Sequence, residues 1–279
     1  MSYKSILVHL DTSESVHSRL ELSLSLAQQF DAYLTGFFTV YRPEPGSFYV
    51  MAGNAEYLVE FEKRRHERQG ALERLFRAEL LRLKVAGEWQ WSTEYANRCV
   101  PRAARLADLT IVGQYDADDP ESFVAEQFVE NLVLSSGRPV LIVPYAGRFH
   151  GVGSHVTIAW DGSREATRAL HDALPFLARA KQVTVLTINA MSGEPPSSRI
   201  PGADIAGVIS RYGAHVATQE IEGVDDVPIG ETILSRAADL NADLLVMGCY
   251  GHSRWRELVL GGATRSILKS MTVPVLMSH

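Results

Sequence analysis

The sequence predicts an α/β fold made of two tandem domains, each a doubly wound sheet of five parallel strands. Three observations lead to this prediction. Short apolar runs alternate with longer amphipathic stretches, the runs are apolar at consecutive positions, and the pattern of the first half recurs in the second. Continuous apolar runs are typical of parallel strands that helices cover on both faces. Their alternation with helices predicts right-handed crossovers and a layered architecture.

Two pairs of segments carry the internal repeat. "ADLTIVGQYD" at 107–116 resembles "ADLLVMGCYG" at 242–251, and "RPVLIVP" at 138–144 resembles "VPVLMSH" at 273–279 with the same offset and no gap. A repeat of this length indicates two copies of one structural unit.

The beginnings of the two copies match as well. "ILVHLDTSE" at 6–14 resembles "VTIAWDGSRE" at 156–165, and in both an apolar run stops at an aspartate. The boundary between the copies lies in 144–155, which is rich in glycine and polar residues. We therefore expect a first domain over residues 1–147 and a second over 148–279.

Five apolar runs predict the strands of the second copy: 155–160, 183–188, 215–221, 243–248 and 273–278. Amphipathic stretches between them predict helices, because apolar residues fall on single stripes: Ala166, Leu170, Leu174 and Leu177 on one, Ile233, Ala237 and Leu240 on another. Pro175 lies inside the first stretch and predicts a kink or a break there. The order predicts a Rossmann-like three-layer sandwich with strand order 3-2-1-4-5.

The first copy contains an insertion. Its chain is longer between Asp11 and Gly113 than the second copy is between Asp161 and Gly248. We assign the extra residues to 42–70, which begins like a proline- and glycine-rich loop and continues as a charged helical pattern. Surface segments tolerate added length, which favours a solvated insertion over a lid or a partner surface.

Composition and charge indicate a packed protein without a polyanionic partner. Hydrophobic residues make up 46% of the chain and charged residues 22%, and the net charge is −6. We therefore expect neither nucleic acid nor a membrane as partner. The two cysteines, Cys99 and Cys249, are too few for a disulfide framework. The first apolar run ends at Asp11, unlike a signal peptide, so we expect a cytoplasmic protein.

A glycine-rich segment, "GCYGHSRWRELVLGGATRS" at 248–266, follows the fourth predicted strand of the second copy. In a doubly wound sheet, ligands bind beyond the carboxyl ends of the strands where the strand order reverses. Asp161 and this segment should therefore flank one crevice. We expect Gly248 and Gly251 to adopt positive φ and to turn backbone N–H groups toward a ligand. We expect Gly261 and Gly262 to open the last helix, whose N-terminus suits a phosphate.

The first copy differs at the same positions. It keeps Gly113, but Asp116, Glu126 and Gln127 stand where the second copy has Gly251, Gly261 and Gly262. Carboxylates at a phosphate position repel the anion. We therefore predict that only the second copy binds a phosphorylated ligand.

The glycine pattern resembles that of the universal stress protein family in its tandem two-domain form. The pattern is Gly248-Cys-Tyr-Gly251, nine residues and then Gly261-Gly262, and Asp161 and the closing apolar run also match. The resemblance implies ATP as the ligand, with or without Mg²⁺. It implies Asp161 beside the ribose and adenine, the backbone of Ile188 beside the adenine, and these residues around the phosphates: Gly248, Gly251, Gly261, Gly262, Ala263 and Thr264.

One position departs from the family pattern. A hydroxyl residue is expected where this chain has Gly262. Its loss removes a hydrogen bond to phosphate of roughly 1.5–3 kcal/mol unless Thr264 or the backbone compensates. With Gly262 at this position, the sequence is compatible both with ATP binding and with its absence.

Several other residues have two interpretations. Asp161 could also cap the following helix together with Ser163, and Asp11 could act only as such a cap. Arg265, in the first turn of the last helix, is balanced between the anion site and the surface. For three side chains of the loop, His252, Arg254 and Arg256, we favour a solvated face over phosphate contacts. For Cys249 we favour an inert thiol. Histidine spacing indicates no metal site.

The leading hypothesis is a non-enzymatic, ATP-binding protein that acts in survival under stress, as the resemblance implies. Slow ATP hydrolysis stays open, although no dedicated general base is evident. The main alternative is a ligand-free dimerisation scaffold. A nucleotidyl-transferring or adenylating enzyme would need a Ser-Gly-Gly loop after the first strand or a His-x-Gly-His motif, and neither is present. The closing runs at 138–144 and 273–279 should pair inside one chain as an internal pseudo-dimer, with further homodimerisation expected.

Overall fold

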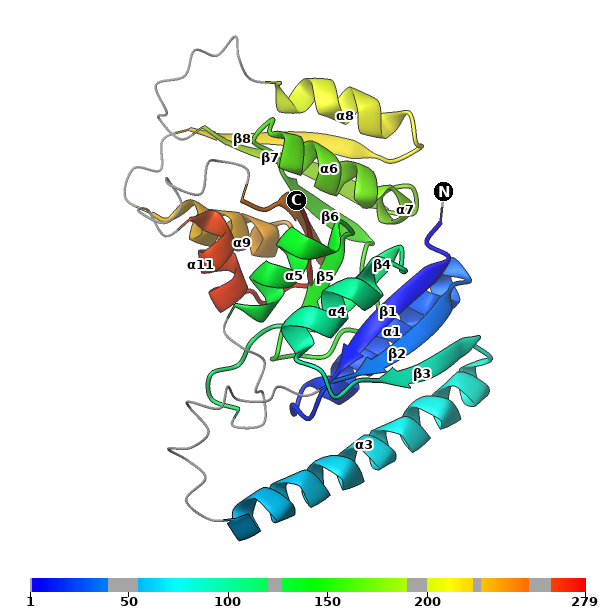
Figure 1. The fold of residues 1–279 in the computed structure, drawn as a ribbon. Helices are drawn as coiled ribbons and strands as arrows, with labels where there is room; N and C mark the ends of the chain where they lie inside the picture. Colours follow the sequence, from blue (N-terminus) through cyan, green and yellow to red (C-terminus); the bar gives the residue numbers. More distant parts are fainter. Residues whose placement is uncertain (1, 40–54, 120–126, 190–199, 223–226, 251–261) are drawn as a thin grey trace.

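The computed structural model describes residues 2–39, 55–119, 127–189, 200–222, 227–250 and 262–279 (Figure 1). In this part of the chain the strands form one ten-stranded sheet in the order β3-β2-β1-β4-β5-β10-β9-β6-β7-β8. When the strands of each half are numbered one to five along the chain, both halves have the order 3-2-1-4-5, with the fifth strand at the junction of β5 and β10. The predicted strand order is therefore confirmed in both halves. The strands are β1 (Ser5–Leu10), β2 (Tyr33–Phe38), β3 (Gly87–Trp91), β4 (Leu109–Gly113), β5 (Val140–Val143), β6 (His155–Ala159), β7 (Gln182–Asn189), β8 (Val216–Glu222), β9 (Leu244–Gly248) and β10 (Val275–Ser278).

The two halves of the sheet meet at their closing strands. β5 and β10 pair antiparallel, with Ile142 opposite Val275 and Val140 opposite Met277. All other neighbouring strands in the described sheet pair parallel. The closing strands therefore lie side by side within one chain, as the sequence led us to expect, and each covers an edge that would otherwise expose unpaired backbone groups.

Helices cover both faces of the sheet and make the three layers. One apolar core includes residues of α1 (Val16–Phe30), α3 (Ala55–Leu83), α6 (Arg164–Asp172), α7 (Leu174–Leu177) and α8 (Gly202–Ser210). The other includes residues of α4 (Ala96–Ala104), α5 (Phe128–Ser136), α9 (Ile229–Asp239) and α11 (Ala263–Ser270). Each core contains residues from both halves of the chain, so the halves form one continuous body.

The predicted break at Pro175 is confirmed. α6 ends at Asp172 and α7 begins at Leu174, with Pro175 in the first turn of α7. Proline has no N–H to donate, and this position does not need one. The short second helix turns its apolar residues into the core, where Phe176 is fully buried.

The helical part of the insertion continues into a long helix. α3 runs along the β3 end of the molecule (Figure 1). Its side chains at 63–70 are exposed or half-buried, whereas Phe76 further along is fully buried. Gly36 of β2 makes room for this ring, because a Cβ on Gly36 would lie 2.8 Å from Phe76 Cε2. The helix is thus anchored by its C-terminal half.

An aromatic cluster joins the two halves on one face. Tyr3 and Phe30 come from the first half and Phe176 from the second, and their ring centroids lie 5.0–5.6 Å apart with edge-to-face geometry. The Tyr3 hydroxyl also donates a hydrogen bond to the Asp172 carbonyl at 2.6 Å. Burial of these rings holds the halves together beyond the strand pairing.

None of the helices in the described residues combines the length and the apolar character needed to cross a membrane.

Candidate functional site

The candidate site lies at the carboxyl ends of three neighbouring parallel strands, β7, β6 and β9. Ala159 of β6 pairs with Leu186 of β7 on one side and with Met247 of β9 on the other. Asp161 follows β6, Ile188 is the second-last residue of β7, and Gly248 ends β9. The fold therefore brings these three predicted residues to the same edge of the sheet.

Asp161 lies exposed at this edge. Its Oδ1 accepts a hydrogen bond from the Ser163 backbone N–H at 2.9 Å. The helix cap is Ser163, whose Oγ accepts from the Ala166 N–H at 3.0 Å. The carboxylate of Asp161 shapes the turn before α6 and stays accessible to a ligand.

Trp160, immediately before Asp161, was not singled out in the sequence. It is 3% exposed, and its indole N–H donates to the Ile200 carbonyl at 2.9 Å. Gly162 has φ +76°, and a Cβ there would lie 3.3 Å from the Ile200 backbone nitrogen. Ile200 therefore lies directly over the turn that holds Asp161. In the sequence, the tryptophan of "AWDGS" was the feature that could have indicated this contact.

Gly248 serves a different purpose from the predicted one. Its φ is not positive, so the expectation of a left-handed turn at this residue was wrong; in the described part of the segment, Tyr250 has the positive φ, 57°. A Cβ on Gly248 would lie 2.5 Å from the Glu165 carbonyl carbon and 2.9 Å from Glu165 Cβ, and would also clash with the Ala166 nitrogen. Glycine is needed because the first turn of α6 packs directly on the end of β9.

The other end of the glycine segment opens α11 as predicted. Gly262 is the N-cap residue, with φ −42° and ψ 162°, and Ala263 and Thr264 form the first turn. Gly230 of α9 approaches closely, because a Cβ on it would lie 2.8 Å from the Ala263 carbonyl oxygen. The first N–H groups of a helix have no partner within it, and helix N-termini in general favour anions for this reason.

Part of the predicted site cannot be placed in the structure. The loop residues Gly251, Gly261, His252, Arg254 and Arg256 lie outside the described residues.

The equivalent crevice of the first half is filled by its own side chains. Asp11 is buried, and its Oδ1 accepts from Arg19 Nη2 at 2.7 Å and from Ser13 Oγ at 2.5 Å. The Arg19 side chain is 2% exposed and lies against Gly113, the counterpart of Gly248, so closely that a Cβ on that glycine would overlap its guanidinium. Asp11 is thus a partner in a buried ion pair, and Arg19 occupies the space.

Burial and charge set the protonation of this cluster. Burial alone raises the pKa of Asp11, but the Arg19 guanidinium, His9 and the Ser13 hydroxyl together bring it below its ordinary value. Burial lowers the pKa of His9 to about 4, against the opposing charge of Asp11. His9 Nδ1 lies 3.8 Å from Asp11 Oδ2, and its Nε2 lies 3.2 Å from the Thr39 carbonyl oxygen. The imidazole is therefore neutral at pH 7.

The acidic residues of the first half only partly match the prediction. Asp116 Oδ1 accepts from the Asp118 N–H at 3.0 Å, so this carboxylate shapes a local turn. Gln127 is the N-cap residue of α5, and Glu126 lies outside the described residues. Asp119, which the sequence analysis missed, accepts from the Glu14 N–H at 3.0 Å just before α1. A carboxylate of the chain itself therefore lies at the start of the first helix.

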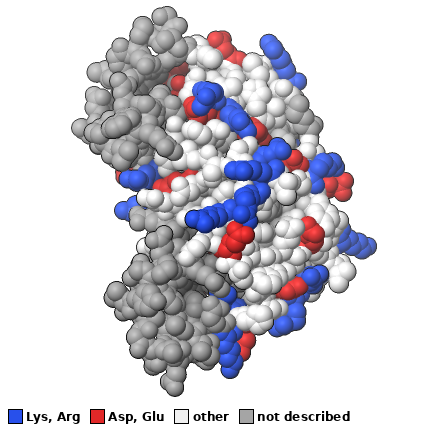
Figure 2. All heavy atoms as spheres, in the orientation of Figure 1, with Lys and Arg blue, Asp and Glu red and all other residues white. Residues whose placement is uncertain are grey.

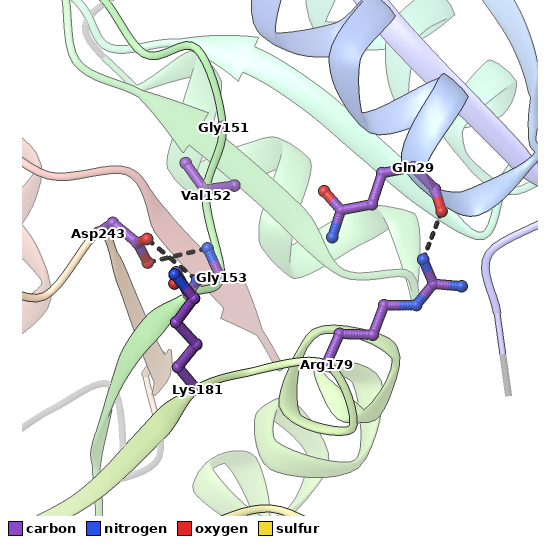
Figure 3. Close-up of a pocket in the computed structure, with 8 residues that line it drawn as sticks. Gln29, Gly151, Val152, Gly153, Arg179, Lys181 and Asp243 are labelled. Carbon is purple, nitrogen blue, oxygen red and sulfur yellow. Dashed lines mark hydrogen bonds between the residues drawn. The ribbon is translucent and has the colours of Figure 1, made fainter.

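A hollow of about 350 Å³ lies at the opposite end of the sheet from the candidate site, between the halves (Figure 3). Asp243 lines it, but its carboxylate already accepts from the N–H groups of Gly153, Ser154 and His155 at 2.9–3.0 Å. Arg179 donates to the Gln29 carbonyl and lies over the Phe30 ring at 5.1 Å. These groups hold the boundary between the halves together.

The surface and the side-chain clusters add two facts. On the face drawn in Figure 2, acidic side chains lie beside the basic ones. Within the described residues, no three His, Cys, Asp or Glu side chains gather in a way that could hold a metal ion.

Residues 154–279 match the model of the universal stress protein family. A universal stress protein of Synechocystis sp. is 28% identical over 153 residues, which are 53% of this chain and 49% of that protein. The chain thus spans about half the length of this curated relative.

Solved structures are similar over nearly the whole chain. A universal stress protein from Archaeoglobus fulgidus has a TM-score of 0.73 at 18% identity and covers 98% of this chain and 95% of its own. A functionally unknown protein from Pseudomonas aeruginosa has a TM-score of 0.60 at 15% identity, with 99% and 92% covered. At these identities, the likeness establishes the fold.

Proposed function

Because the chain belongs to the universal stress protein family through its C-terminal half, we propose that it is a non-enzymatic, nucleotide-binding protein of the stress response. In this proposal, residues 148–279 form a universal stress protein domain that holds ATP, and residues 1–147 form a degenerate copy.

The contrast between the two crevices carries this proposal. In the first half, Arg19 fills the space beside Asp11 and Gly113. In the second half, the residue in register with Arg19 is Ala169, which has no side chain able to reach the crevice, and Asp161 is exposed. A buried arginine that satisfies the aspartate leaves no room for a ligand, whereas an exposed aspartate leaves an acceptor free for one.

Each predicted residue has a role that its position allows. Asp161 would accept a hydrogen bond from a ribose hydroxyl, and the backbone of Ile188 would lie against the adenine. Gly262, Ala263 and Thr264 at the start of α11 would bind phosphate through backbone N–H groups and the positive end of the helix dipole. Gly248 keeps α6 and β9 in contact beneath the ligand, and Gly251 and Gly261 would complete the loop.

A ligand-free scaffold is the second candidate function. Two observations favour it: the antiparallel pairing of β5 with β10, which ties the two halves as a pseudo-dimer would, and the absence of a hydroxyl at Gly262. In this alternative the chain acts through its surfaces, alone or as a homodimer, and never retains nucleotide.

Released nucleotide separates the two candidates. We expect that denaturing the freshly purified protein releases an adenine nucleotide detectable by mass spectrometry, and that calorimetry detects ATP binding. Neither release nor binding at millimolar ATP would leave the scaffold as the function.

Asp161→Asn tests the site itself. We expect ATP binding about tenfold weaker, because the variant loses a charge-assisted hydrogen bond. Asp239→Asn is the matched control, since Asp239 ends α9 at the opposite edge of the sheet and lies in an exposed ion pair with Arg236. Equal loss in both variants would place the ligand elsewhere.

A further inference from the structure

Gln114 follows β4 in the first half, and its side chain reaches into the second half. The residue is 5% exposed. Its Nε2 donates to the carbonyl oxygens of Leu268 at 2.8 Å and Lys269 at 3.2 Å, and its Oε1 accepts from the Tyr145 N–H at 3.2 Å. The buried amide thus has hydrogen-bond partners on both of its ends.

Leu268 and Lys269 lie in the last turn of α11. The last carbonyl groups of a helix have no partner within it, so Gln114 satisfies two of those in α11. The opposite end of the helix is held by the close approach of Gly230 in α9 to Ala263. α11 is therefore positioned by its own half at the N-terminus and by the other half at the C-terminus.

The contact runs from the first half to the second and has no equivalent in the reverse sense. In the second copy, Cys249 stands at the position that corresponds to Gln114, because the Cys249 N–H donates to the Ser278 carbonyl just as the Gln114 N–H donates to the Val143 carbonyl. A thiol has one weak donor and cannot give two N–H hydrogen bonds. The first half therefore holds α11 in a way that the second half cannot reproduce on α5.

We propose that Gln114 is a positioning residue for nucleotide binding, through which the closed first half orients the phosphate-binding helix of the second half. This inference rests on the proposed function of α11. The N-terminus of α11 offers its N–H groups to the phosphates, and a tilt of this short helix about the Gly230 contact would change the direction in which they point. Gln114 fixes the far end of the helix and thereby fixes that tilt.

Two variants of Gln114 and one control test the inference. Gln114→Met keeps a similar volume without polar atoms, and Gln114→Glu places a carboxylate against the two carbonyl oxygens. Tyr3→Phe is the matched control, because it deletes another hydrogen bond between the halves, to Asp172, away from α11. The measurements are the dissociation constant for ATP and hydrogen exchange of the α11 amides without nucleotide.

We expect both Gln114 variants to bind ATP about three- to tenfold more weakly and to exchange the α11 amides about three- to tenfold faster. Tyr3→Phe should leave both quantities at wild-type values even where it lowers the melting temperature, which separates positioning from general stability. Unchanged exchange and affinity in the Gln114 variants would overturn the inference. If wild-type protein binds no ATP, the proposed function fails, and the exchange rates still decide whether Gln114 holds α11.

Discussion

Gly248 shows how one missing side chain joins two elements. The first turn of α6 lies against the end of β9 at this residue, and a Cβ would overlap the backbone of Glu165 and Ala166. The same arrangement in the first half leaves room at Gly113 for the Arg19 guanidinium. One glycine position is therefore used for helix packing in one copy and for a buried ion pair in the other.

Gly248→Ala should lower the free energy of unfolding by about 3 kcal/mol, because backbone must move to admit the methyl group. Urea denaturation measures this change. Gly207→Ala is the control: a Cβ on this exposed glycine of α8 meets nothing within 4 Å, so alanine should raise stability by about 0.5–1 kcal/mol through helix propensity. Equal effects at the two glycines would contradict the close contact at β9.

His9 makes stability depend on pH. Its pKa in the folded protein is about 4, below the ordinary value of 6.5. Between these values the unfolded chain binds a proton that the folded protein does not, so this contribution to stability is complete above pH 6.5 and is lost as the pH falls toward 4. The loss amounts to about 2 kcal/mol by pH 5.

His9→Gln should therefore reduce the difference in unfolding free energy between pH 8 and pH 5 by about 2 kcal/mol. His171→Gln removes an exposed imidazole and is the control for the loss of a histidine at the surface. The depressed pKa of Asp11 acts at lower pH: its contribution is present above about pH 4 and is lost as the pH falls further. An unchanged pH difference in His9→Gln would mean that this imidazole is not held neutral.

At the scale of elements, the strands were the most predictable part. The five runs predicted in the second copy coincide with β6 to β10 within one or two residues. Their apolar residues are consecutive because helices cover both faces of the sheet, and this pattern is local in the sequence. The break before α7 was predictable for the same reason, since the effect of Pro175 acts on its own turn.

α11 offers a direct test of the departure from the family pattern. Gly262→Ser should tighten ATP binding about tenfold by restoring a hydroxyl donor to phosphate. The negative φ of −42° and the extended ψ suit a serine N-cap, so the variant should fold without strain. Gly262→Ala is the control, because it makes the same backbone change without the hydroxyl. Calorimetry that finds serine no better than alanine would remove the phosphate from this position.

At the scale of the whole molecule, the sheet is continuous because β10 lies between β5 and β9. The apolar cores on both faces extend across this junction. The two halves are therefore coupled by strand pairing, by the cluster of Tyr3, Phe30 and Phe176, and by Gln114.

Truncation after Ser270 should cause aggregation, because it removes β10 and leaves β5 and β9 with unpaired edges. Light scattering and size-exclusion chromatography measure the effect. Removal of His279 alone is the control, since this residue follows β10 and its Nδ1 lies 3.0 Å from the Cys249 carbonyl oxygen. A monodisperse truncated protein would show that the junction is not needed for solubility.

The sequence by itself determined the strands, because each is a run of consecutive apolar residues, and the repeat, because both copies keep the same runs. The strand order followed from the doubly wound arrangement that these runs predict. It also predicted that Asp161 and Gly248 lie at one edge of the sheet, since parallel strands in this order end there, and the family resemblance added Ile188. It did not predict that Arg19 fills the space beside Asp11, because an arginine in a helix is ordinarily exposed. The glycine that makes room for it, Gly113, lies at the end of β4, far from Arg19 in the sequence. Only the tertiary structure decided that Arg19 fills the space beside Asp11 and where Gln114 reaches, because both depend on the packing of residues that are far apart in the chain.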